Sequence, residues 1–188
     1  MDQVITLYHT NSPEICNDFL NNKIQLYVSD QNGGQWLGAG MYFWDNLSNA
    51  RYWGNQKLKR ISQCHIICVN VQFDRSNLLD LTDLETSDYI IELWEKYCEK
   101  TNTDFRSDLG CVLNTLFNAI SELNNKFYLI KAIGNNYSTK SDLFEKTYHK
   151  KIRVSLSGKV IYNIRKEHII KEKELKEIYY GERYKRVF

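Results

Sequence analysis

The chain has 188 residues, of which 43% are hydrophobic and 26% are charged, and its formal net charge is +2. This length is enough for one domain with its own core, and the composition is that of an ordinary globular protein. The small net charge gives no argument for a nucleic acid or a membrane surface as the partner.

The cysteines and the N-terminus bear on the compartment. The five cysteines are odd in number, form no C-x-x-C pair and lie mostly in apolar surroundings. That pattern favours buried free thiols in a reducing compartment over disulfides or a zinc site. No apolar segment typical of a signal peptide or a membrane span occurs. We therefore expect a cytoplasmic protein with no membrane partner and no metal.

The first quarter of the chain carries local signals for strands and one helix. Branched and aromatic residues predict a strand over residues 4–9. Ser12 and Pro13 predict the start of a helix that ends near residue 20, because serine caps helices and proline suits their first position. A short strand over residues 23–27 and a polar loop over residues 29–36 are expected next.

Residues 38–44, with the sequence GAGMYFW, combine two glycines with three consecutive aromatic residues. Glycine lets a backbone approach a ligand closely, and aromatic rings offer flat faces to a planar group. The stretch fits a strand that enters the core after a turn, and it equally fits one wall of a binding site. A short helix is expected over residues 46–53.

The second half of the chain mixes helices and strands. Residues 64–73 are almost continuously apolar at first and alternate later, which predicts a central strand. Apolar residues at helical spacing predict helices over residues 88–98 and 111–123, the first preceded by a turn at residues 78–83. A strand over residues 127–133 and a polar loop over residues 134–148 follow.

The last quarter of the chain predicts a cluster of strands. Strands over residues 150–156 and 159–164 are expected around a tight turn at Ser157 and Gly158. A charged amphipathic helix is expected from about residue 171. Helices placed between strands without regular alternation predict an α+β fold, in one domain over residues 1–188.

Two motifs, in this order, carry a resemblance to a known family. Leu7-Tyr8-His9-Thr10 ends the first predicted strand, and the stretch GAGMYFW follows it, before Ser48-Asn49-Ala50-Arg51-Tyr52. The chain resembles the ADP-ribosyltransferase fold, most closely the branch related to poly(ADP-ribose) polymerases and diphtheria toxin, and an uncharacterised bacterial and phage group within it. The resemblance is dense over residues 4–54 and plausible through residue 83. It implies split antiparallel β-sheets with flanking helices.

The resemblance implies that the chain binds NAD. His9 matches the histidine whose ring N–H would bond the adenosine-side ribose hydroxyl. Thr10 stands where the family has glycine, whose backbone clamps the nicotinamide carboxamide. Gly40 belongs to the glycine motif, and Tyr42 matches the family's second site position.

Two further positions come from the predicted helix after this motif. Tyr52 matches the tyrosine that stacks on nicotinamide, so Tyr42 and Tyr52 would sandwich the ring. Ser48 is a candidate to bond the carboxamide. Each of these residues also fits an ordinary role at the end of a strand or on a half-buried helix face.

The family's third element is a glutamate on a late strand, which bonds the nicotinamide ribose and orients the nucleophile. Here that position falls on or near Lys151 or Gly158, and neither residue is acidic. Glu145 in the preceding loop is our candidate substitute, although a solvated loop glutamate is the simpler interpretation. A lysine beside a developing cation would be electrostatically unfavourable.

The leading functional expectation is therefore a mono-ADP-ribosyltransferase. It would cleave NAD at the nicotinamide–ribose bond and transfer ADP-ribose to a protein or nucleic acid. It would act as a toxin-like or phage-associated effector that an antitoxin or immunity partner could neutralise. One alternative is a module that binds NAD, ADP-ribose or a nucleic-acid end without transfer. Another is an interaction protein that uses its tyrosine and tryptophan surface.

Overall fold

The computed structural model describes residues 2–28, 36–135 and 158–181. The strands there are β1 (Asp2–Asn11), β2 (Tyr27–Val28), β3 (Gly40–Trp44), β4 (Cys64–Asp74), β5 (Leu78–Asp80), β6 (Leu129–Asn135), β7 (Gly158–Ile164) and β8 (Ile170–Tyr179). The α-helices are α1 (Pro13–Leu20), α2 (Leu47–Lys57), α3 (Leu84–Thr101), α4 (Leu109–Ala119) and α5 (Ser121–Lys126). This mixture confirms the predicted α+β class.

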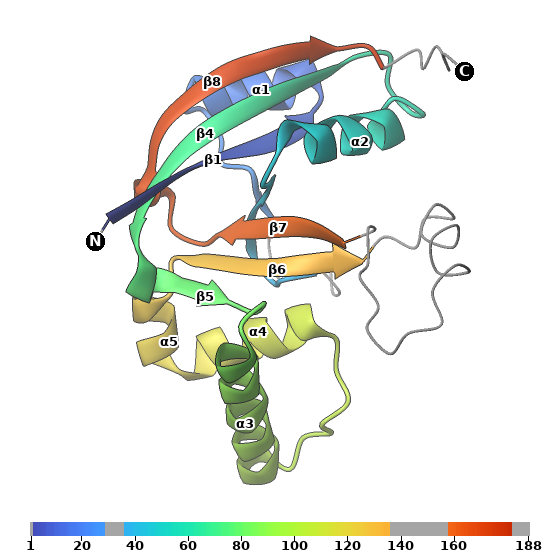
Figure 1. The fold of residues 1–188 in the computed structure, drawn as a ribbon. Helices are drawn as coiled ribbons and strands as arrows, with labels where there is room; N and C mark the ends of the chain where they lie inside the picture. Colours follow the sequence, from blue (N-terminus) through green and yellow to red (C-terminus); the bar gives the residue numbers. More distant parts are fainter. Residues whose placement is uncertain (1, 29–35, 136–157, 182–188) are drawn as a thin grey trace, which may run out of the picture.

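The described strands form one mixed sheet in the order β5-β6-β7-β3-β1-β4-β8, with β2 pairing to β3 off this path (Figure 1). The β5–β6 pair is parallel, and the other pairs are antiparallel. β1 pairs with β4 along its whole length, but it meets β3 only at Tyr8 opposite Trp44. The sheet is therefore almost divided in two between β1 and β3.

Local caps explain where the helices beside this division begin. The Ser12 hydroxyl accepts a hydrogen bond from the Ile15 amide, and Pro13 opens α1, as the sequence predicts. The Asn46 side chain caps α2 in the same way, by accepting from the Asn49 amide at 2.8 Å. Both helices thus start from capped turns that follow β1 and β3, and both pack against β1 and β4, on one side of the division.

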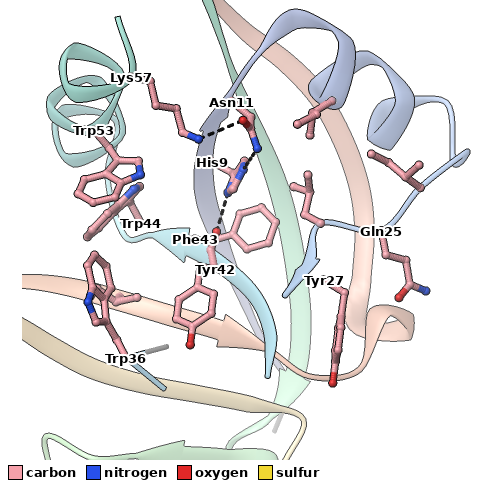
Figure 2. A pocket seen from close by; sticks show the side chains of 14 residues that line it. His9, Asn11, Gln25, Tyr27, Trp36, Tyr42, Phe43, Trp44, Trp53 and Lys57 are labelled. Carbon is pink, nitrogen blue, oxygen red and sulfur yellow. Dashed lines mark hydrogen bonds between the residues drawn. The ribbon is translucent and has the colours of Figure 1, made fainter. Parts of the chain in front are cut away.

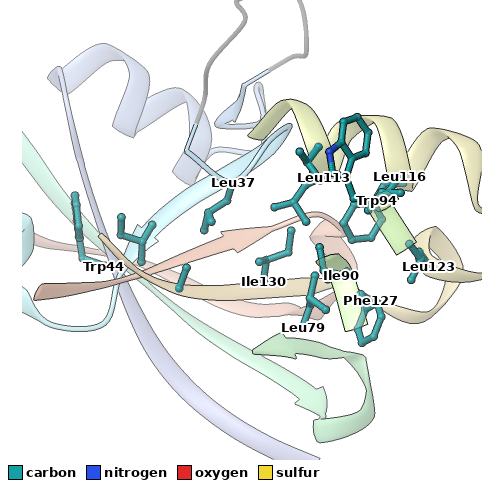
Figure 3. Close-up of a cluster of buried hydrophobic side chains, with 14 of the residues drawn as sticks. Leu37, Trp44, Leu79, Ile90, Trp94, Leu113, Leu116, Leu123, Phe127 and Ile130 are labelled. Atoms are coloured by element: carbon teal, nitrogen blue, oxygen red, sulfur yellow. The ribbon is translucent and has the colours of Figure 1, made fainter. Parts of the chain in front are cut away.

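Two apolar clusters pack the two faces of the sheet. One cluster lies under α1 and contains Phe19 of that helix together with Phe43 of β3. The other lies under the remaining helices and includes Trp44, Trp94 and Leu116 (Figure 3). Neighbouring β3 residues thus serve different clusters, because successive side chains of a strand point to opposite faces.

The predicted C-terminal helix from about residue 171 is wrong, because Ile170–Tyr179 forms the edge strand β8. The backbone of β8 pairs with β4 from Val71 opposite Ile170 to Cys64 opposite Tyr179. The buried strand β4 needs hydrogen-bond partners for its backbone on both sides, and this demand outweighs the local helix preference of a Lys- and Glu-rich segment. Charged side chains also suit an edge strand, because they discourage further pairing.

Other boundaries differ from the prediction in smaller ways. The expected turn at residues 78–83 begins with the strand β5, and the expected strand at residues 23–27 is only Tyr27–Val28. The expected helix over residues 111–123 is two helices, α4 and α5, which meet at the extended residue Ile120. β6 continues through Asn135, so the predicted loop does not start at residue 134.

Several expectations lie outside the described residues. These are the strand over residues 150–156, most of the loop over residues 134–148 with its candidate Glu145, and Ser157 of the expected turn. Among the helices that the structure describes, none has the length and apolar character needed to cross a membrane.

Candidate functional site

A pocket of about 490 Å³ lies where β1 and β3 separate (Figure 2). Its volume is within the range of small-molecule sites. The pocket draws residues from both sides of the division, because β1 supplies two of its lining residues and β3 supplies three. α1 and β2 contribute to one wall, and α2 and β7 contribute to the other. Its lining is formed by His9, Asn11, Ile15, Ile24, Gln25, Leu26, Tyr27, Trp36, Tyr42, Phe43, Trp44, Trp53, Lys57 and Ile161.

His9 joins the two strands at the base of this pocket. Its Nδ1 lies 2.7 Å from the carbonyl oxygen of Tyr42, which can only accept, so Nδ1 carries the proton. Burial and, to a smaller extent, the charge of Lys57 lower the pKa of His9 to about 4, against the opposing effect of its hydrogen bond to the Tyr42 carbonyl. His9 is therefore neutral at physiological pH, and its Nε2 is a hydrogen-bond acceptor.

Asn11 and Lys57 extend this arrangement. The Lys57 ammonium donates to the Asn11 side-chain oxygen at 3.0 Å, and the Ser12 amide donates to the same oxygen at 3.0 Å. These donors fix the orientation of the amide group, so its NH₂ faces His9 Nε2 at 3.4 Å. Figure 2 shows the resulting row of Lys57, Asn11, His9 and the Tyr42 carbonyl.

Three tryptophans form an aromatic wall on the α2 side of the pocket (Figure 2). The Trp53 ring lies 5.5 Å from Trp36 and 5.7 Å from Trp44, measured between ring centroids. Trp36 also meets Tyr42 edge-on at 6.4 Å. Trp36 is 47% exposed, whereas Trp44 is buried. The wall thus offers aromatic faces and edges at the mouth of the pocket, where a planar ring could pack.

Tyr42 has a second, structural role. Its hydroxyl donates to the Gly38 carbonyl at 2.6 Å and accepts from the Leu37 amide at 2.9 Å. Burial raises the pKa of Tyr42 to about 12, so the phenol stays protonated. Its ring lines the pocket, but its hydroxyl closes the turn before β3.

The glycines of this turn are required by neighbouring side chains. Gly40 has a φ of +149°, and a Cβ there would overlap the Asn163 side-chain oxygen. Gly38 has a φ of +73°, and a Cβ there would overlap the Asn114 side chain. The buried Asn163 amide donates to the carbonyls of Leu37, Gly38 and Ala39. The glycine motif is therefore shaped by two asparagines, of which Asn163 is buried and Asn114 half-buried, and Gly40 does not line the pocket.

The structure places three other sequence-predicted residues outside the pocket lining. Thr10 is buried and its hydroxyl donates to the Ala50 carbonyl at 2.8 Å, which ties α2 to β1. Ser48 is exposed in the first turn of α2. The Tyr52 ring faces the Lys159 ammonium at 4.8 Å. His9 and Tyr42 are thus the two predicted residues that the structure brings together in the pocket.

No carboxylate lines the described part of the pocket. Gly158, one of the two positions expected for the family glutamate, is an exposed residue at the start of β7. The other position, near Lys151, and the substitute Glu145 lie outside the described residues. Lys57 is the one lysine or arginine among the described lining residues.

Sequence reasoning missed three pocket residues that local spacing could have indicated. Asn11 lies two residues after His9, and alternate residues of a strand share a face. Trp53 and Lys57 are four residues apart, which places them on one face of α2.

Asn163, which shapes the turn before β3, was also missed. This buried residue interrupts an apolar strand, and a buried amide requires hydrogen-bond partners. No protein family matches this chain, and no curated protein sequence matches it.

Proposed function

We propose that this protein is an NAD-dependent mono-ADP-ribosyltransferase of the branch that its motifs resemble. The observation that carries the proposal is the direct hydrogen bond from His9 of β1 to the Tyr42 carbonyl of β3, inside a pocket at the division of the sheet. The resemblance of the motifs implies that His9 and Tyr42 share a nicotinamide site. Their contact inside one pocket supports this proposal independently of the motifs. The near-division of the sheet also supports the split sheets of that fold.

The lining residues fit the parts of NAD. Aromatic rings of the tryptophan wall suit the planar nicotinamide, whose positive charge also favours aromatic faces. His9 Nε2 can accept a hydrogen bond from a ribose hydroxyl that replaces the long 3.4 Å contact from the Asn11 amide. This acceptor role corrects the expected donor role, since the ring N–H already serves the Tyr42 carbonyl. The pocket thus has groups for a ring and for a sugar in one continuous space.

The proposed reaction breaks the bond between nicotinamide nitrogen and ribose C1. The electron pair of that bond leaves with nicotinamide, which becomes neutral, while positive charge develops on the ribose. A nucleophile of the acceptor then bonds to C1 and releases its proton. Neutral His9 adds no charge near the developing cation, and a rigid ring site holds the leaving group.

The direct test incubates the purified full chain with NAD and measures released nicotinamide by chromatography, alongside labelling of a cell lysate with biotinylated NAD. We expect release in the wild type and loss of release in His9→Ala. His168→Ala is the matched control, because His168 is exposed and packs against Tyr128 outside the pocket. Equal nicotinamide release by wild type and His9→Ala would contradict the site assignment.

A second candidate function is binding of NAD or ADP-ribose without transfer. The observation that favours it is the lack of a carboxylate in the described pocket lining. In the resembled family that group bonds the nicotinamide ribose and orients the nucleophile. Calorimetry separates the two functions: saturable NAD binding with no nicotinamide release supports the binding module, and Glu145→Gln then has no effect on NAD affinity.

A further inference from the structure

Lys57 differs from two other half-buried lysines, Lys131 and Lys173, in the kind of group to which its ammonium donates. Lys131 donates to the Asp80 carboxylate at 2.8 Å, and Lys173 donates to the Glu167 carboxylate at 2.9 Å. Lys57 donates to the neutral amide oxygen of Asn11. No described carboxylate forms an ion pair with Lys57, so its positive charge has no counter-charge among those residues.

The surroundings of Lys57 make this missing counter-charge significant. Its side chain enters a pocket lined mainly by apolar and aromatic residues, and no acidic residue is among the described lining. A cation in such a place loses hydration and gains strongly from a nearby anion. An ammonium has three donors, and one of them is used on Asn11, so others remain for a ligand in the pocket.

We infer that Lys57 binds a phosphate group of the ligand and makes the pocket selective for nucleotides over nucleosides. The inference deepens the proposed function and rests on it for the identity of the ligand, where the group is the pyrophosphate of NAD. Different lining residues of the pocket then bind different chemical groups of the ligand. The tryptophan wall suits the ring, His9 suits a ribose hydroxyl, and Lys57 suits the pyrophosphate between the two nucleosides.

The position of Lys57 at the end of the hydrogen-bonded row supports this assignment. Asn11 lies between Lys57 and His9, so an anion held by Lys57 would sit one side chain away from the proposed ribose acceptor. Ribose and pyrophosphate are neighbouring groups in a dinucleotide. The spacing of the protein groups therefore follows the order of the ligand groups.

The test measures calorimetric affinities of wild type and Lys57→Gln for NAD, ADP-ribose and adenosine. We expect Lys57→Gln to weaken NAD and ADP-ribose binding by about 10- to 100-fold, the loss typical of one charge-assisted hydrogen bond, and to change adenosine binding by less than about threefold. Lys57→Arg should keep most of the phosphate affinity. Lys59→Gln is the matched control, since Lys59 is exposed and bonds Gln56.

The outcomes separate this inference from the proposed function. Equal affinity of wild type and Lys57→Gln for ADP-ribose overturns the inference, even where nicotinamide release confirms the transferase. An equal loss for adenosine and ADP-ribose also overturns it, because that result indicates general damage. Lys57-dependent binding of ADP-ribose, with neither NAD binding nor nicotinamide release, supports the inference and overturns the proposed function.

Discussion

The turn at residues 37–40 and the pocket both contain residues of the stretch GAGMYFW, but they differ in how their polar groups are used. In the turn, the carbonyls of Leu37, Gly38 and Ala39 all accept from the Asn163 side chain. In the pocket, Lys57 has donors to spare and Trp36 is 47% exposed. The turn is completed by the protein itself, whereas the pocket has capacity for a ligand.

This difference shows that a motif can be required for two separate reasons. Gly40 is needed because Asn163 occupies the space of a side chain, so its substitution should act on folding. The acceptor nitrogen of His9 lies in the pocket and meets only the long contact from the Asn11 amide at 3.4 Å, so its substitution should act on binding. Tyr42 belongs to both regions, since its ring lines the pocket and its hydroxyl closes the turn.

The largest expected effect is on the turn. Gly40→Ala should lower the free energy of unfolding by about 3 kcal/mol or more, because it adds a Cβ against Asn163 at a φ of +149°. Urea denaturation followed by tryptophan fluorescence measures the change. Gly134→Ala is the control, since its φ is not positive and its Cβ would press on the terminal carbon of the Ile161 side chain, with the Lys159 carbonyl at an ordinary 3.8 Å. It should change stability by less than about 1 kcal/mol.

A double variant sharpens this interpretation. Asn163→Ala removes the atoms that a Cβ at position 40 would meet, so the double variant should be less destabilised than the sum of the single variants. Additive effects would show that the glycine is not required by Asn163, and the contrast between turn and pocket would then fail.

The next largest effect concerns pH and belongs to the pocket. The pKa of His9 falls from 6.5 to about 4 on folding, chiefly through burial. The unfolded chain therefore binds a proton that the folded chain does not over this pH window, and stability falls as the pH drops from 6.5 to about 4. His9 accounts for about 3 kcal/mol of that loss. Below the window its contribution is constant.

Denaturation curves at several pH values in this window test the prediction. His9→Gln has no titrating ring, so its stability should depend less steeply on pH than that of the wild type. Parallel pH profiles for the two proteins would show that His9 is protonated equally in the folded and unfolded states. His9 would then be accessible to water, and its neutral state in the pocket would be wrong.

Local signals were enough to predict much of the fold. The Ser12 and Pro13 cap fixes α1, and the apolar run of β4 identifies a central strand, because these preferences act within a few residues. β8 could not be predicted in this way. Its charged residues resemble a helix face, and they form a strand because β4 needs a partner that is distant in the sequence.

The candidate site was predictable in part for the same reason. The order of the motifs predicted that His9 and Tyr42 lie in the same site, and in the structure His9 Nδ1 lies 2.7 Å from the Tyr42 carbonyl oxygen. Lys57 reaches the pocket from α2, and Asn163 reaches the turn from β7. Local spacing can indicate these two residues, but their hydrogen-bond partners are distant in the sequence and no local pattern encodes them. The side chain that α2 presents to the pocket depends on its rotation, since neighbouring residues of a helix point about 100° apart.

The smallest expected effect separates Trp53 from Tyr52, the neighbour that the motif favours. Trp53 lines the pocket between Trp36 and Trp44, whereas the Tyr52 ring faces Lys159. Trp53→Leu should weaken NAD binding about tenfold, because it removes an aromatic face worth about 1.4 kcal/mol to a planar ring. Tyr52→Leu should weaken it by less than about threefold. Calorimetry with thermal melting of each variant measures binding and folding separately, and a larger loss for Tyr52→Leu would show that α2 presents Tyr52 when NAD is bound.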